Sequence, residues 1–212
     1  PKKSPKKYRV WLFSFYQIVL VFAIIVAAIA TYTAVKNGII GKSESGYSIT
    51  YRSETGCPTT SNFIEETART ASSGGAASAA IMWAIVIVLA GLWYQNFKLF
   101  KTDNESEIIK LNHPILISLI VLCVVTAAVF GYDCASTSWI EYYHFSMPGD
   151  AKWVSYASLF DGGTLATKDG ISFANIWNCS VAYTFFSGAT FVCLVPAIVF
   201  SAKTYMNWRI TA

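Results

Sequence analysis

The sequence predicts an all-α membrane protein: a bundle of four transmembrane helices with two sizeable extracytoplasmic loops. The first observation is composition, because 54% of the 212 residues are hydrophobic and only 13% are charged, whereas soluble domains average about a quarter charged residues. The second is four long uncharged stretches, each close to the 20 or so residues that a bilayer core requires. The third is a nine-residue basic lead-in with five positive charges and no negative one.

The first uncharged stretch organises the rest of the chain. It runs for 26 residues, and at about 1.5 Å per residue such a helix is about 39 Å long, enough to cross a bilayer with some tilt. Within it Ala23, Ala27 and Ala30 form a stripe of small residues where a neighbouring helix is expected to approach closely. The four predicted spans cover residues 10–35, 76–97, 115–132 and 181–202 of one membrane domain, residues 1–212, with outer loops at 36–75 and 133–180.

The distribution of basic residues predicts the orientation in the membrane. The N-terminus, the connection between the second and third spans and the C-terminus hold ten Lys and Arg, and the two outer loops hold six. Basic residues are retained on the cytoplasmic side. The sequence therefore predicts an integral, multi-pass protein with both termini in the cytoplasm, or in the matrix or stroma of an organelle, and it does not identify the membrane.

The basic lead-in has more than one interpretation. It is a topology determinant or a contact to anionic lipid, since each basic residue near a membrane surface contributes about 1 kcal/mol of attraction. A tail tethered to a membrane seldom meets DNA, so nucleic acid is not an expected partner. The candidate lipid contacts are Lys2, Lys3, Lys6, Lys7 and Arg9.

The chemistry that is missing from the spans argues against an enzyme or a transporter. The interiors of the predicted spans contain no Asp, Glu, Lys, Arg or His, although proton relays and ion pathways place such residues there. Gln17 and Thr126 are expected to satisfy neighbouring helices instead. His113 and His144 fall on opposite sides of the membrane and cannot share a metal. We therefore expect no catalytic residues, no cofactor and no metal site.

The cysteines divide by location. Cys123 and Cys193 fall inside spans and are expected to pack as small apolar residues. Cys134 and Cys179 bracket the second outer loop, so they are the candidate disulfide in an oxidising compartment. Cys57, in the first outer loop, is an alternative partner for either of them.

The outer loops are expected to fold into a cap that contacts other proteins, because the second loop is rich in Trp and Tyr. The sequence also allows a small β element in these loops. Residues 47–51 alternate large and small side chains as a strand does, and residues 153–156 offer a second strand beside it. The candidate partner contacts are Tyr142, Tyr143, Trp153 and Tyr156.

Two stretches resemble the MARVEL group of physins and related vesicle proteins. They are the lead-in Lys7-Tyr8-Arg9-Val10-Trp11 and the last span, from Ser180-Val181-Ala182-Tyr183 to Lys203-Thr204-Tyr205. The resemblance implies a four-helix bundle that organises membrane domains or assists vesicle traffic without catalysis, and it supplies no site residues. Claudin-like proteins are a weaker comparison, because they carry a Trp and a cysteine pair in the first outer loop. Here that loop has one cysteine and no Trp.

Two functions follow from these observations. The first is a non-catalytic tetraspan protein that organises a membrane domain, a vesicle or a complex through protein and lipid contacts. The second is an accessory structural subunit of a large organellar complex, such as a respiratory assembly. In both cases the expected partners are membrane lipids and other membrane proteins, in a homo- or hetero-oligomer. A pore is disfavoured, because no span shows a polar stripe.

Overall fold

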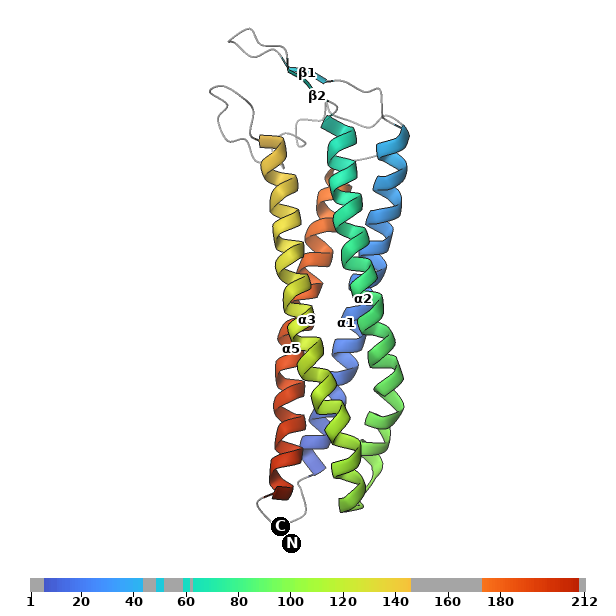
Figure 1. Ribbon diagram of the computed structural model, residues 1–212, viewed down its shortest axis with the longest axis vertical. Coiled ribbons are helices and arrows are strands. Elements are labelled where there is room, and N and C mark those ends of the chain that lie inside the picture. Colours follow the sequence, from blue (N-terminus) through green and yellow to red (C-terminus); the bar gives the residue numbers. More distant parts are fainter. Residues whose placement is uncertain (1–5, 44–48, 52–58, 62, 146–172, 210–212) are drawn as a thin grey trace. The chain divides into compact units, whose positions relative to one another are not determined.

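The computed structural model describes residues 6–43, 49–51, 59–61, 63–145 and 173–209, and the side chains of residues 6–36, 72–137 and 178–205. Long helices dominate these residues (Figure 1). The elements in chain order are α1 (Lys6–Ser43), β1 (Ile49–Tyr51), β2 (Thr59–Ser61), α2 (Phe63–Lys101), α3 (Glu105–Phe145) and α5 (Phe173–Arg209).

Within the described residues, four helical segments are long and apolar enough to cross a membrane. This confirms the prediction of a helical, multi-pass membrane protein. The segments are Lys6–Lys36, Ser72–Lys101, Glu105–Thr137 and Asn178–Tyr205.

The helices continue well beyond the predicted spans, so parts of the predicted outer loops are helical. α1 runs on to Ser43, α3 to Phe145, and α5 begins already at Phe173. A helix ends where its backbone hydrogen bonds end, whereas an apolar window ends where the hydrocarbon does. As a result Asp133, which the sequence places at the start of the second outer loop, lies inside α3.

α2 continues without a break through two adjacent glycines just before the second predicted span. Gly74 and Gly75 lie within α2 and both are buried. A Cβ on Gly75 would come within 2.9 Å of the Ala30 carbonyl oxygen and 3.1 Å of the Ala34 nitrogen, both in the backbone of α1. Gly75 is therefore needed for the close approach of two helices, which is a common use of glycine in membrane proteins.

The β element is a two-stranded antiparallel pair. Ile49 pairs with Ser61, and Tyr51 pairs with Thr59. β1 falls in the alternating stretch at residues 47–51 and pairs with β2, whereas the second strand expected at residues 153–156 lies outside the described residues. The two strands are close in sequence, and antiparallel strands need only a short connection.

The chain divides into two compact units, each with a part of all four long helices. Unit 1 comprises Pro1–Ala27, Ala80–Gly131 and Phe185–Ala212, and unit 2 comprises Ala28–Ala79 and Tyr132–Thr184. Within each unit, helices that follow one another along the chain run in opposite directions (Figure 1). Neither unit is a separate stretch of sequence, because every long helix contributes to both.

Helical spacing accounts for the buried face of α1. In unit 1 the buried positions Leu12, Tyr16, Val19 and Ala23 recur every three or four residues, which places them on one side of a helix. Ala23, Ala27 and Ala30 are all fully buried, as the small-residue stripe predicts.

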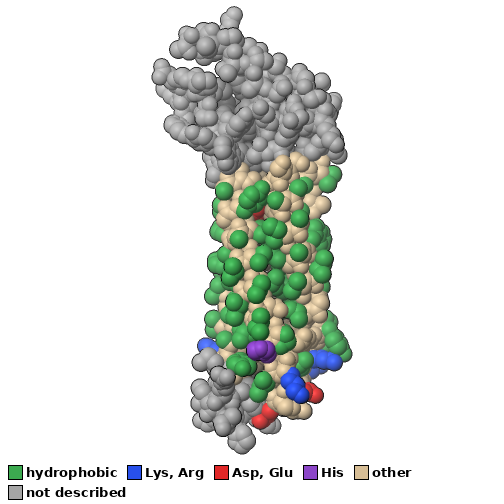
Figure 2. Space-filling model, in the orientation of Figure 1, with side chains coloured by type: hydrophobic (Ala, Val, Ile, Leu, Met, Phe, Trp, Pro, Cys, Tyr) green, Lys and Arg blue, Asp and Glu red, His purple; other side chains and the backbone are tan. Residues whose placement is uncertain are grey.

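The outward-facing side chains are largely apolar, as a surface in contact with lipid requires. In unit 1, Ile87, Val124 and Phe185 are 67–70% exposed. On the face shown in Figure 2 apolar side chains extend along the helices, whereas the charged side chains gather at the end of unit 1 that holds the connection from α2 to α3.

Candidate functional site

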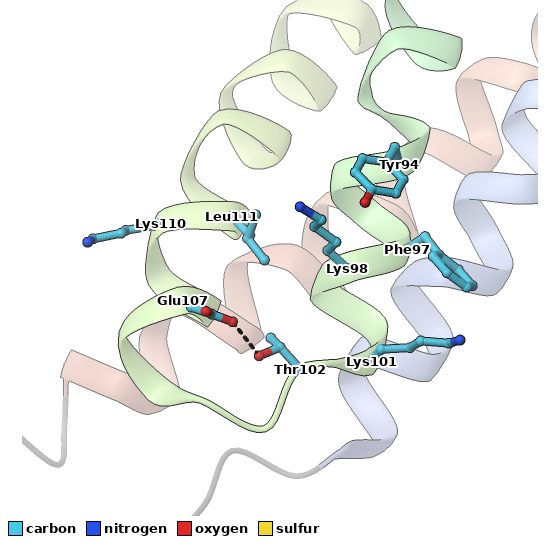
Figure 3. A pocket seen from close by; sticks show the side chains of 8 residues that line it. All are labelled: Tyr94, Phe97, Lys98, Lys101, Thr102, Glu107, Lys110 and Leu111. Atoms are coloured by element: carbon cyan, nitrogen blue, oxygen red, sulfur yellow. Dashed lines mark hydrogen bonds between the residues drawn. The ribbon is translucent and has the colours of Figure 1, made fainter.

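A groove lies in unit 1 where α2 ends and α3 begins (Figure 3). Its volume is about 530 Å³, which is within the range of roughly 300–1,000 Å³ typical of small-molecule sites. The residues that line it are Tyr94, Phe97, Lys98, Lys101, Thr102, Glu107, Lys110 and Leu111.

A well-defined connection holds the two walls of the groove together. At the end of α2 the Thr102 amide donates to the Lys98 carbonyl at 2.8 Å. At the start of α3 the Asn104 side chain accepts a hydrogen bond from the Ser106 amide at 3.2 Å, which is the usual contact of an N-terminal cap. The Thr102 hydroxyl donates to a Glu107 carboxylate oxygen at 2.7 Å and so joins the two sides.

Two lysines of the groove lie over aromatic rings one helical turn earlier. The Nζ atom of Lys98 is 4.7 Å from the ring centre of Tyr94, and that of Lys101 is 4.5 Å from the ring centre of Phe97. Both distances fall within the range of cation–π attraction. In Figure 3 Lys98 extends into the space between Tyr94 and Leu111, whereas Lys101 and Lys110 extend away from each other.

From the sequence alone, the three lysines Lys98, Lys101 and Lys110 predict only the orientation of the chain. The signal for a site was available in the spacing, because Tyr94 and Lys98, and likewise Phe97 and Lys101, are four residues apart. Residues four apart share one face of a helix. The spacing does not predict that Lys110 and Leu111, on the other side of the connection, line the same groove.

Arg9 differs from the other candidate lipid contacts. Its side chain is only 4% exposed, and its guanidinium donates to the carbonyls of Leu99, at 3.2 Å, and Thr102, and to the Asp103 carboxylate at 3.4 Å. The carbonyls in the last turn of a helix lack partners within the helix, so Arg9 satisfies the end of α2. Its predicted role as a lipid contact does not fit this internal position.

The remaining lead-in residues are placed only in part. Lys6 and Lys7 are exposed, and the Lys7 ammonium is 5.3 Å from the ring centre of Tyr8. Lys2 and Lys3 lie outside the described residues. Lipid contact by these four lysines therefore stays a prediction.

Several polar side chains inside unit 1 join one helix to another. The Tyr16 hydroxyl on α1 donates to the Leu89 carbonyl on α2 at 2.5 Å. Asn112 on α3 donates to the Ser201 carbonyl on α5 at 2.9 Å, and the Ser201 hydroxyl donates back to the Asn112 side-chain oxygen at 2.8 Å. Tyr16, Asn112 and Ser201 are fully buried, so these bonds are protected from water.

The two polar residues predicted to satisfy neighbouring helices behave differently. The Gln17 side-chain oxygen accepts a hydrogen bond from the Trp93 indole at 3.2 Å, which supports the prediction for Gln17. The Thr126 hydroxyl is buried and has no hydrogen-bond partner among the residues that the structure describes.

Unit 2 contains a buried polar cluster around Asp133. This side chain is fully buried, and its carboxylate accepts a hydrogen bond from the Ser78 hydroxyl on α2 at 3.3 Å. Ser136, one turn further along α3, and the Tyr183 hydroxyl of α5 both lie against Gly74. The predicted third span ends at residue 132, and Asp133 directly follows it within the helical segment Glu105–Thr137 that is apolar enough to cross a membrane. A buried carboxylate among hydroxyls can accept hydrogen bonds and exchange a proton.

The predicted disulfide between Cys134 and Cys179 does not fit the helix register. In unit 2 the hydroxyls of Thr137 on α3 and Thr184 on α5 are 3.1 Å apart. Cys134 precedes Thr137 by three residues and Cys179 precedes Thr184 by five. Because α3 and α5 run in opposite directions (Figure 1), the cysteines are displaced by about 12 Å along the helix axes. A disulfide needs Cα atoms within about 7 Å, and both thiols are free.

The predicted partner contacts are not tested. Tyr142 and Tyr143 lie in α3, but their side chains are outside the described part of the chain, and Trp153, Tyr156 and Cys57 are outside it altogether. Among the described residues, no three His, Cys, Asp or Glu side chains are grouped as metal ligands.

Comparisons with known proteins add no assignment. No family model matches the sequence. Neither the curated proteins nor the solved structures contain a match.

Proposed function

We propose that this protein is a non-catalytic membrane protein that organises a membrane domain, a vesicle or a protein complex through lipid and protein contacts. The observation that carries the proposal is the use of polar side chains inside unit 1. Tyr16, Asn112 and Ser201 each form hydrogen bonds to a neighbouring helix. In a bilayer such hydrogen bonds hold helices together, so they favour a structural role for the interior.

The outer surface then provides the contacts for function. Large apolar side chains face outward along the helices of unit 1, and the aromatic and basic residues of the groove lie at its charged end. The described side chains of unit 1 include seven basic and three acidic residues. By the positive-inside rule, the proposal places this end, and with it both termini, on the cytoplasmic side or its organellar equivalent.

The experiment separates an organiser from a transporter. The full chain is reconstituted into liposomes that carry a proton, sodium or potassium gradient, and the same preparation is cross-linked to detect neighbouring protein molecules. We expect the gradient to decay as slowly as in empty liposomes, and we expect discrete cross-linked species of this chain or with co-purified membrane proteins.

The Asp133→Asn variant is the control in the gradient assay, because Asp133 is a fully buried carboxylate in the described part of unit 2. A gradient that decays with the original chain and persists with the variant would overturn the proposal and identify a transporter. Cross-links confined to subunits of one large complex would instead assign the chain as an accessory subunit of that complex.

A further inference from the structure

We propose that the groove between the end of α2 and the start of α3 binds the phosphate-bearing headgroup of an anionic phospholipid. The inference rests on the proposed function, since it names the class of lipid and the site that recognises it. It involves Lys98, Lys101 and Lys110 rather than the basic lead-in.

Charge is the first argument. Three of the eight lining residues are lysines, and the single acidic one, Glu107, already accepts a hydrogen bond from Thr102 at 2.7 Å. The lining residues therefore carry a net positive charge, with Lys98 directed into the groove and Lys101 and Lys110 at its edges, extending away from each other (Figure 3). Lysine ammonium groups bind phosphate as point charges, so the ligand should be an anion.

Position is the second argument. Tyr94, Phe97 and Lys98 belong to the last turns of the membrane-spanning segment Ser72–Lys101. Aromatic side chains at the end of a span sit at the level of the lipid headgroups. The Trp93 ring stacks on Phe97 with a centroid distance of 5.4 Å and extends the same aromatic surface. A phospholipid phosphate would meet the groove at this depth.

The mixture of polar and apolar walls is the third argument. The side chains of Tyr94, Phe97 and Leu111 present apolar surface next to the ammonium groups, and Tyr94 itself is 61% exposed. A soluble anion would not bury this apolar surface, whereas the glycerol and first acyl carbons of a phospholipid would cover it. The ligand that matches both parts of the groove is an anionic lipid.

The lysines are also partly ordered before a ligand arrives. Lys98 and Lys101 lie over the rings of Tyr94 and Phe97, which restricts the rotamers of two otherwise flexible side chains. Because these side chains are already ordered in the free protein, they lose less conformational entropy when a ligand binds. Lys98, directed into the groove (Figure 3), is therefore the expected centre of phosphate recognition.

The test is native mass spectrometry of the full chain in detergent, titrated with short-chain phosphatidylserine or phosphatidylcholine. We expect the first lipid to bind and the second to bind at least tenfold more weakly. The double variant Lys98→Ala/Lys110→Ala should weaken phosphatidylserine binding about 25-fold, or about fivefold for each lysine removed. The side chains of both lysines are exposed, and unchanged thermal unfolding verifies that the variant folds.

Lys203→Ala is the matched control. Lys203 is an exposed lysine of unit 1 on α5, and it also lies near an aromatic ring, 5.7 Å from the centre of Tyr8, but it does not line the groove. Its removal should change phosphatidylserine binding less than twofold. A loss equal to that of the double variant would show attraction to surface charge in general and overturn the site.

Two further outcomes would also reject the proposal. Equal binding of phosphatidylcholine would show that the negative headgroup is not recognised. Competition by inorganic phosphate at the same concentration as the lipid would assign the groove to a soluble anion. Failure of the site leaves the liposome gradient unaffected, so it is distinguishable from failure of the proposed function.

Discussion

The two units bury polar side chains with different hydrogen-bonding chemistry. In unit 1 the neutral residues Asn112 and Ser201 exchange two hydrogen bonds: the Asn112 amide donates to the Ser201 backbone carbonyl and accepts from the Ser201 hydroxyl. In unit 2 the carboxylate of Asp133 accepts a bond from Ser78, and an ionised carboxylate can only accept. A reciprocal neutral pair costs little to bury, whereas a carboxylate depends on the donors around it. The difference lies in the type of buried group: the described interior of unit 1 holds this reciprocal neutral pair, whereas that of unit 2 holds a carboxylate.

The largest effect is expected from placing a carboxylate in unit 1. Asn112→Asp removes the donor to the Ser201 carbonyl and leaves an acid where an amide was satisfied. Uncompensated buried charge typically costs about 3–5 kcal/mol, and we expect a loss of this size in the free energy of unfolding in detergent.

The reverse change, Asp133→Asn, is the control for that experiment. It keeps a side-chain oxygen that can accept from Ser78 and removes the charge, so we expect a change below about 1 kcal/mol. Equal losses for the two variants would show that the two interiors do not differ in the way described.

Glycine substitutions compare the closeness of helix packing in the two units. In unit 2 a Cβ on Gly75 meets backbone atoms of α1 at 2.9 and 3.1 Å, whereas in unit 1 a Cβ on Gly91 meets nothing within 4 Å. Gly75→Ala should therefore destabilise by about 1–3 kcal/mol. Gly91→Ala should stabilise by about 0.5–1 kcal/mol through helix propensity. Thermal unfolding of the two alanine variants measures the sign of each change in stability. Changes of the same sign for both variants would refute the close approach at Gly75.

The smallest effect concerns two buried tyrosines. The Tyr16 hydroxyl donates to the Leu89 carbonyl in unit 1, while the Tyr183 hydroxyl in unit 2 has no hydrogen-bond partner of normal geometry among the described residues. Tyr16→Phe should cost about 0.6 kcal/mol, the average for such bonds in a membrane protein. Tyr183→Phe should leave the free energy of unfolding unchanged or slightly raised, because removing a buried hydroxyl without a partner also removes its desolvation penalty. Chemical denaturation of both variants measures the difference, and a larger loss at Tyr183 would contradict it.

The sequence by itself was sufficient for the membrane-spanning segments and for the buried stripe of α1. Apolarity over some 20 residues and small residues at helical spacing are local properties. A bilayer imposes the helix on any such stretch, because the backbone has no other partner there. For this reason Ala23, Ala27 and Ala30 could be assigned to a helix contact without knowing which helix they meet.

Only the tertiary structure decided the roles of individual polar residues. Arg9 contacts carbonyls 90 or more residues away, and nothing in the basic lead-in distinguishes it from the lysines beside it. Asp133 lies just past an apolar run, so its burial depends on how far α3 continues. The separation of Cys134 from Cys179 follows from the register of α3 against α5. Hydropathy is a local property, and it indicates which segments leave water. The hydrogen-bond partner of a polar side chain and the register of two helices depend on contacts between distant segments, which the sequence does not specify.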